Sequence, residues 1–224
     1  MGILFALAIL FAWGTHQVYI LIYQPIDLTD IWFWMNLLLQ TWLFTGLFIT
    51  AHDAMHGTVS KKRLINNSIG MIASIFYAGL WYPKLKPKHY LHHLHPATSQ
   101  DPDYKTGNQN FFVWWFAFMR QYITIWQFLI MATLFNIGLL WFNELQLIVL
   151  WILPSVASTF QLFYFGTYVP HRLPHTETMH PHQARSQRNN HFVALISCYF
   201  FGYHYEHHAS PGIPWWKLFR MKQM

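Results

Sequence analysis

Four apolar stretches, each long enough to cross a lipid bilayer, constrain the fold of this chain more than any other feature. They occupy Gly2–Tyr23, Ile31–Thr50, Gln121–Phe142 and Leu145–Gly166. Only 10% of the residues are charged, whereas 54% are hydrophobic, and a transmembrane helix needs about 20 consecutive apolar residues. The sequence therefore predicts an all-α integral membrane protein with four transmembrane helices, folded as a single domain over residues 1–224.

The Lys and Arg residues are distributed unevenly between the two sides of the predicted membrane. The connections Gln24–Asp30 and Asn143–Glu144 contain none, and all 14 basic residues lie between Ala51 and Arg120 or after the fourth stretch. Cytoplasmic loops carry an excess of Lys and Arg, so both basic regions are expected in the cytoplasm. Four crossings return the chain to its starting side, which places both termini there as well.

Histidines form three clusters with spacings that suit metal ligands on a helix. The first cluster has the pattern HxxxH, and the other two have the pattern HxxHH. Residues three and four apart share one helix face, so the imidazoles of a cluster converge. Eight imidazoles exceed the coordination number of one ion, which predicts two metals, and neutral imidazole suits iron, copper and zinc. The clustered histidines are His52, His56, His89, His92, His93, His204, His207 and His208.

The predicted topology places the three clusters on the cytoplasmic side, together with His171. Two shorter apolar runs, Ile69–Tyr82 and Phe192–Tyr203, would move a cluster across the membrane if either crossed it alone. Both are too short to span comfortably, and we expect re-entrant or interfacial helices there. The sequence thus predicts a cytoplasmic, histidine-rich cap that holds two metals.

The composition disfavours several other kinds of protein and site. The formal net charge is +6, but basic runs such as Lys61–Arg63 adjoin membrane spans, where anionic lipid headgroups explain them better than nucleic acid does. Cys198 is the only cysteine, so neither a disulfide within the chain nor a thiolate metal site is expected. The HExxH motif of zinc metalloproteases is absent. Nothing suggests a reductase module, so electrons for an oxidation would come from another protein.

The motifs together resemble the membrane fatty-acid desaturase and hydroxylase superfamily, whose members use a histidine-ligated di-iron centre, O2 and an external electron donor. The finer sequence is similar to the bacterial-type β-carotene ketolases of that superfamily. The similar stretches are His52–Gly57, His89–Pro96 with Asp101–Asp103, Phe165–Arg172 with Ala184–Ser186, and Phe201–His208 with Pro211 and Pro214–Trp216. The resemblance covers nearly the whole chain, from Gly2 to about Leu218.

This resemblance implies a β-carotene 4-ketolase, which would convert the β-ionone rings of β-carotene to 4-keto rings and give echinenone and then canthaxanthin. The implied cofactors are two iron ions (Fe2+), with O2 as co-substrate. The implied partners are the carotenoid, membrane lipid and an electron donor such as ferredoxin. The eight clustered histidines and His171 would ligate the irons. Asp53, the candidate catalytic residue, and Glu206 lie between ligands, where each would accept the second N–H of an imidazole or form a surface salt bridge.

Three other functions remain open on the sequence. A carotenoid ring hydroxylase would use the same metals and stop after one oxygen, and a fatty-acyl desaturase would use them to remove two hydrogens. A metal transporter would place polar ligands along a path within the membrane spans. Outside the motifs, His175, His180 and His182 are expected to be solvated loop residues, and His16 is expected to be structural.

Overall fold

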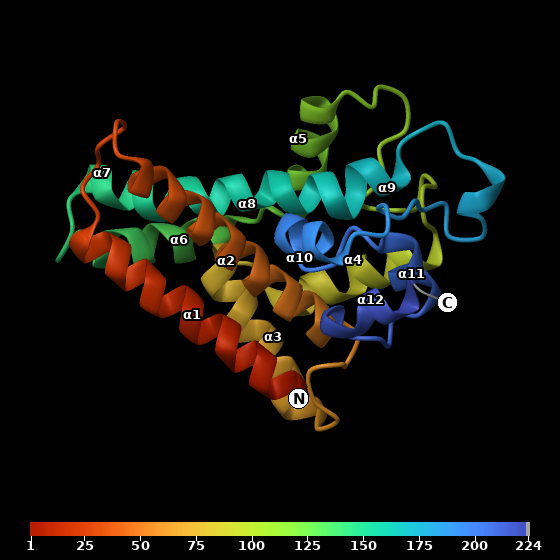
Figure 1. Cartoon of the computed structure of the whole chain (residues 1–224), viewed down its shortest axis with the longest axis horizontal. Helices are drawn as coiled ribbons and strands as arrows, with labels where there is room; N and C mark the ends of the chain where they lie inside the picture. The colour runs from red at the N-terminus through yellow and green to blue at the C-terminus, as the bar shows by residue number, and fades with distance from the viewer. Residues whose placement is uncertain (223–224) are drawn as a thin grey trace.

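The computed structural model describes residues 1–222, which form helices joined by turns and loops, with no strand in this range. Figure 1 shows the helices in chain order. The first six are α1 (Gly2–Tyr23), α2 (Ile31–Met55), α3 (Arg63–Ala78), α4 (Tyr82–Leu94), α5 (Phe111–Tyr122) and α6 (Ile125–Gly138). One continuous rod follows: α7 (Glu144–Leu147), the π-helical turn η1 (Ile148–Ile152), α8 (Leu153–Phe163), the π-helical turn η2 (Tyr164–Tyr168) and α9 (Val169–His171). The rest comprises η3 (Glu177–Met179), α10 (His191–Cys198), α11 (His204–Ala209), η4 (Trp215–Lys217) and α12 (Leu218–Met221).

Three of the described helices are long and apolar enough to cross a membrane: α1, α2 and the α7–α9 rod. The bounds of α1 agree with the prediction. The other two helices continue beyond the predicted ends, since α2 runs past Thr50 to Met55 and the rod runs past Gly166 to His171. Both extensions carry histidines, so the long helices themselves deliver metal-ligand candidates to the site.

The third predicted span is shorter than expected, because helix α6 covers only 14 residues of Gln121–Phe142. Ile123 and Thr124 are extended and separate α6 from α5. The Thr124 hydroxyl accepts a hydrogen bond from the Gln127 backbone N–H at 3.2 Å and starts a new helix there. A helix of this length is about 21 Å long, which is less than the roughly 30 Å hydrocarbon core.

The short apolar runs form short helices, as their lengths suggested. α3 and α4 meet at an angle of 98°, and by composition this bent pair is either a broken span or a re-entrant segment. Gly79 makes the bend possible, since it ends α3 with a left-handed φ of 67°. The run Phe192–Tyr203 contributes only the eight-residue helix α10.

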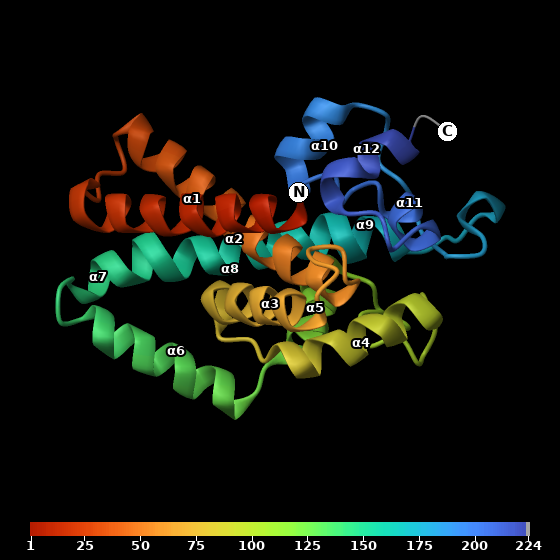
Figure 2. The ribbon, with the colours of Figure 1, turned by 90° about the horizontal axis from the view of Figure 1, so that it is seen from below.

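Helix α2 lies at the centre of the bundle and packs against α1, α3 and α8 (Figure 2). Gly70 lets α3 approach α2 closely: a Cβ there would lie 2.9 Å from the Ala54 Cβ and 2.5 Å from the Tyr82 ring. Phe44, Leu47 and Met55 of α2 are buried in the main hydrophobic core. This packing holds the C-terminal end of α2, which carries the first histidine cluster.

The histidine-bearing helices gather at one end of the molecule. Figures 1 and 2 both place α4, α9 and α11 at this end, and α7 and the α1–α2 connection at the other. Gly2 lies against the backbone of Val59, in the loop after α2, so the start of α1 is also close to the histidine end. α12 contacts α11 there. The ends of the described chain therefore lie toward the same end of the bundle.

Candidate metal centre

Four segments that are distant in the sequence bring nine histidines together. α2 and its C-cap residue supply one each, α4 supplies three, α9 one and α11 three. They are the eight clustered histidines and His171, which were the predicted ligands: His52, His56, His89, His92, His93, His171, His204, His207 and His208. The structure divides them into two groups, within each of which the candidate ligand atoms all lie within 4.8 Å of one another. The predicted count of two metal sites agrees with this division.

The five-histidine group consists of His52, His56, His89, His93 and His207. The Nε2 atom of His89 lies 2.6 Å from that of His56 and 3.1 Å from that of His93. The Nε2 atom of His207 lies 3.0 Å from that of His93. Nitrogen atoms from three helices therefore converge on one small volume.

The four-histidine group consists of His92, His171, His204 and His208, all of which are buried. The Nε2 atom of His208 lies 3.1 Å from the Nε2 atoms of both His92 and His204. His171 completes the group from the end of the α7–α9 rod, with its ring centroid 4.9 Å from those of His92 and His204. His171, which lies outside the three sequence clusters, thus occupies a position like those of the clustered histidines.

The spacing and burial of these atoms fit bound metal ions. Two imidazole nitrogens bound at about 2.1 Å and at right angles to each other are roughly 3.0 Å apart, and four of the five Nε2 separations are 3.0–3.1 Å. The Nε2 atoms of His52 and His171 are buried and have no hydrogen-bond partner among residues 1–222. A metal ion would satisfy these two atoms, which would otherwise be costly to bury.

The protonation of the α11 histidines also suits metal binding. Burial, followed by the charges of neighbouring imidazoles, holds the pKa values of His204, His207 and His208 well below the usual range. These rings are therefore neutral at physiological pH. A histidine must be neutral to donate a nitrogen lone pair to a metal.

Two of the four-histidine group are oriented through their second ring nitrogen. His92 Nδ1 lies 3.0 Å from both carboxylate oxygens of Asp101, and His171 Nδ1 lies 2.9 Å from the backbone oxygen of Gln183. Because these oxygens only accept, Nδ1 carries the proton in both rings, and Nε2 is left to face the group. Such partners commonly orient metal-ligating histidines. Asp101 was not among the predicted site residues, although its place nine residues after His92 in an acidic Asp-Pro-Asp turn was an available signal.

Asp53 and Glu206, for which the sequence left an imidazole partner or a surface salt bridge open, both have partners other than imidazole nitrogens. Asp53 Oδ2 accepts a hydrogen bond from the Trp215 backbone N–H at 3.2 Å, and its Oδ1 is 3.8 Å from His52 Nδ1, beyond hydrogen-bond distance. Glu206 forms an ion pair with Lys222 at 3.1 Å and accepts from the Ser186 hydroxyl. The salt-bridge alternative therefore describes Glu206, whereas Asp53 ties the end of α2 to the loop before η4.

The remaining histidines differ in their surroundings. His180 is exposed, as expected, but His175 and His182 are half-buried. The loop after α9 folds back over the site, which brings the His182 ring centroid to 5.9 Å from that of His208. His16 is structural, as expected: its Nδ1 lies 2.6 Å from Gln40 Oε1, which links α1 to α2.

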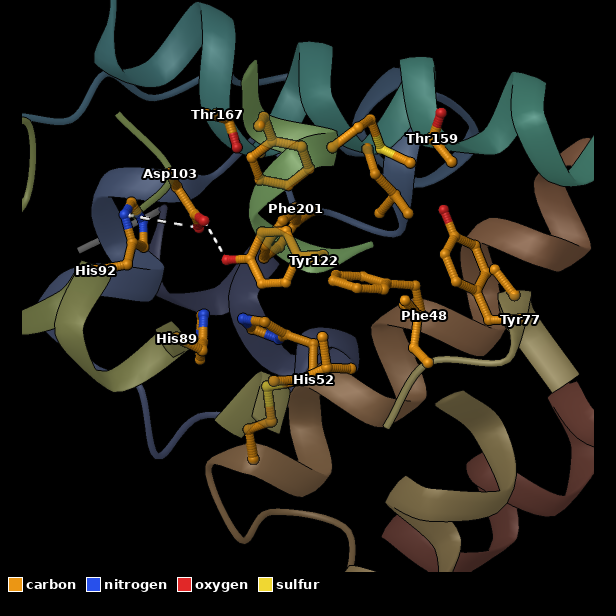
Figure 3. A pocket seen from close by; sticks show the side chains of 18 of the residues that line it. Phe48, His52, Tyr77, His89, His92, Asp103, Tyr122, Thr159, Thr167 and Phe201 are labelled. Carbon is orange, nitrogen blue, oxygen red and sulfur yellow. Dashed lines mark hydrogen bonds and ion pairs between the residues drawn. The ribbon is translucent and has the colours of Figure 1, made fainter. Parts of the chain in front are cut away.

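An apolar cavity adjoins both histidine groups (Figure 3). One end is formed by His52 and His89 of the five-histidine group and by His92 and His204 of the four-histidine group. Most of the other lining side chains are apolar, among them Phe48, Met55, Leu85, Phe118, Leu162 and Phe201. The polar side chains in the wall are Asp103, Tyr122, Tyr77, Gln127, Thr159 and Thr167. An apolar molecule in this cavity would therefore contact imidazoles of both groups.

Comparison with known proteins gives a consistent result. The family model described as Fatty acid desaturase matches residues 30–127 and 117–224. The chain is 41% identical over 187 residues to a protein named Beta-carotene ketolase from a Paracoccus species (strain N81106), a match covering 82% of this chain and 76% of that protein. It is 39% identical over 186 residues to a Beta-carotene ketolase from Paracoccus strain PC1, with the same coverage of 82% and 76%.

An algal protein is equally similar but much longer. The chain is 42% identical over 188 residues to a Zeaxanthin 4-ketolase from Chlamydomonas reinhardtii, and the match covers 81% of this chain but only 42% of that protein. The family model spans the segments that carry all nine grouped histidines. On this basis the chain belongs to the fatty acid desaturase family, as its histidine motifs implied.

Proposed function

We propose that the protein is a β-carotene 4-ketolase that oxidises the β-ionone rings at a di-iron centre. The observation that carries the proposal is the apolar cavity that ends at both histidine groups. The ketolase names of the relatives support the choice of substrate. A hydrocarbon ring suits a cavity with mostly apolar walls, because its burial is driven by the loss of apolar surface from water.

The proposed reaction oxidises one ring carbon twice. In each round, one oxygen atom of O2 enters a C4–H bond, and the other leaves as water with two electrons from a donor protein and two protons. The first round gives a secondary alcohol, and the second gives a geminal diol, which loses water to form the ketone. Because β-carotene has two equivalent ends, repetition at the second ring gives canthaxanthin after echinenone.

The nine grouped histidines would hold two irons, five imidazoles on one side and four on the other. Iron ligated by imidazole can activate O2, which is the chemistry that the family relationship implies and that zinc does not supply. The chain's own contribution is to orient the imidazoles and to exclude water. His92 and His171 are fixed by Asp101 and by the Gln183 backbone, and the aromatic walls shield the reacting carbon.

The substrate would arrive from the bilayer. α6 is peripheral, since all of its side chains are at least partly exposed. Met119, Ile123 and Gln127, which stand at and beside the α5–α6 break, line the cavity. A ring that passes this wall would reach the histidines, while the polyene tail would extend along the apolar surface of the helices toward lipid.

The topology that we propose has four crossings, with the histidine end in the cytoplasm. The crossing segments are α1, α2, the shorter α6 with its flanking residues, and the α7–α9 rod. In Figure 2, α3 leads away from the start of α1 and α4 returns to the histidine end, which supports a re-entrant pair. α6 then leads toward α7, and the rod returns the chain to the site. The absence of Lys and Arg from both short connections supports the cytoplasmic assignment.

A labelling experiment tests the reaction. Purified protein supplied with iron, β-carotene, reduced ferredoxin and 18O2 should form echinenone and canthaxanthin, with label in the ketone after a reaction shorter than its exchange with water. Zeaxanthin as the product would instead assign a ring hydroxylase. Unchanged carotenoid together with new double bonds in the lipids would assign a desaturase.

A further inference from the structure

Two polar side chains interrupt the apolar wall of the cavity at its histidine end. Asp103 is buried, with an exposed fraction of 9%, and its Oδ2 lies 3.9 Å from His92 Nδ1. The Tyr122 hydroxyl is hydrogen-bonded to Asp103 Oδ1. Figure 3 shows the Tyr122 side chain in the cavity with its hydroxyl directed at Asp103, on the same side as His89 and His92. The pair therefore stands where a reacting ring would meet the histidines.

The position of this pair is fixed by several hydrogen bonds. The Asp103 backbone N–H donates to Asp101 Oδ1 at 2.8 Å, and the Trp114 indole N–H donates to the Asp103 backbone oxygen at 2.8 Å. Tyr122 is the last residue of α5, and the preceding Gln121 backbone oxygen accepts from Lys88. Both ends of the pair are thus held by the framework that also orients His92.

The hydrogen bond determines what the pair offers to a ligand. A tyrosine hydroxyl has one proton and two lone pairs. When the proton is donated to Asp103, the remaining capacity of Tyr122 Oη and of the carboxylate is to accept. A hydrocarbon ring leaves these acceptors without a partner, which is unfavourable in an apolar cavity. A ring that carries a hydroxyl can donate to them.

We propose that Tyr122 and Asp103 bind the hydroxyl of the half-oxidised ring and thereby commit the enzyme to the ketone. The inference rests on the proposed function and concerns its intermediate, the secondary alcohol formed in the first round. Retention of that alcohol keeps the same carbon beside the histidines for the second round, which consumes a second O2 and two further donor electrons. Tyr122 is then a positioning residue: retention of the alcohol gives the ketone of a ketolase, whereas its release would give the alcohol of a hydroxylase.

The product ratio of a Tyr122→Phe variant tests this role. In a β-carotene-producing host, the ratio of ring alcohol to ketone should rise roughly three- to tenfold, because one hydrogen bond to the alcohol is lost. Tyr199→Phe is the matched control. Its hydroxyl is also buried, lies outside the cavity and has no hydrogen-bond partner within the described chain, so the ratio should stay at the wild-type value.

A ratio in Tyr122→Phe equal to that of the wild type, with ketone still formed, would overturn the role of Tyr122 and leave the proposed function standing. A wild-type protein that forms no ketone would overturn the proposed function itself. Asp103→Asn provides a second variant, since its amide NH2 replaces an acceptor with a donor. It should shift the ratio in the same direction as Tyr122→Phe.

Binding without turnover separates positioning from a general structural defect. Iron-loaded protein without an electron donor can be titrated with β-carotene and with its 4-hydroxy derivative, with tryptophan fluorescence quenching as the readout. Tyr122→Phe should weaken binding of the alcohol roughly three- to tenfold relative to the hydrocarbon. Equal weakening of both ligands would indicate a merely structural role and would contradict the proposal.

Discussion

His92 and His93 are neighbours in the chain, but their imidazoles belong to different histidine groups. His93 Nε2 lies 3.0 Å from His207 Nε2, whereas His92 Nε2 lies 3.1 Å from His208 Nε2. The adjacent histidines of α4 thus pair with the adjacent histidines of α11. These two short helices form the boundary between the groups and would set the distance between two bound metals.

Loss of a single ligand from one group should affect that group first. His93→Ala removes an imidazole of the five-histidine group only, so the iron content measured by mass spectrometry of the purified protein should fall by about half. Ketolase activity should fall by more than the 10- to 100-fold that is typical when only a partner of a ligand is changed. The control is His180→Ala, which alters an exposed histidine outside both groups. Full iron content and activity in His93→Ala would rule out the assignment.

Asp101 should matter for the metal even though it is not a member of either histidine group. Asp101→Asn keeps the size of the side chain but weakens the acceptor that fixes the His92 ring. Iron affinity or activity should fall roughly 10- to 100-fold. Asp27→Asn is the matched control, because Asp27 lies in the connection between α1 and α2, where its side chain accepts hydrogen bonds from the Thr29 backbone N–H and hydroxyl. If the two variants behaved alike, the orienting role of Asp101 would be refuted.

The close packing of α3 on α2 should be sensitive to one methyl group. Gly70→Ala places a Cβ 2.5 Å from the Tyr82 ring and 2.9 Å from the Ala54 Cβ, which forces the helices apart and should destabilise the protein by about 1–3 kcal/mol. Gly14→Ala in α1 has no atom within 4 Å of the new Cβ and should be neutral or slightly stabilising. Thermal unfolding of both variants in detergent checks this. A Gly70→Ala protein as stable as Gly14→Ala would contradict the packing described.

The proposed topology can be tested with an impermeant thiol reagent. In a Cys198→Ser background, cysteines at Thr29 and Asn143 should react from outside intact cells, because both connections would lie on the external side. Cysteines at Ser60 and Ser186 should react only after the cells are opened, since both positions are near the histidine end. Labelling of Ser60→Cys or Ser186→Cys in intact cells would show that the histidine end faces outward and would contradict the proposed orientation.

The apolar spans and the histidine ligand candidates could be predicted because each depends on local chemistry. The length of α1 follows from uninterrupted apolar sequence. The spacing of four residues places His52 and His56 on one side at the end of α2. The break between α5 and α6 was not predicted, because a hydropathy pattern does not reveal the N-cap residue that begins a new helix. Thr124 followed by Gln127 three residues later is a capping pattern that could have revealed it.

The division of the histidines into two groups could not be predicted from one sequence. Helical spacing tells which residues of one helix share a face, but it does not tell which helices meet. The pairing of His93 with His207 depends on how α4 and α11 pack, and these helices are over 100 residues apart in the chain. The contact between Asp103 and Tyr122 depends in the same way on the loop that joins α4 to α5.

Pigment analysis of a β-carotene-producing host tests the central claim most directly. Cells that express the wild-type chain should accumulate echinenone and canthaxanthin, identified by chromatography and mass spectrometry. Cells that express His207→Ala, which removes a member of the five-histidine group, should retain β-carotene. Accumulation of ketocarotenoid in both strains, or of unchanged β-carotene in both with the proteins present in the membrane, would contradict the account.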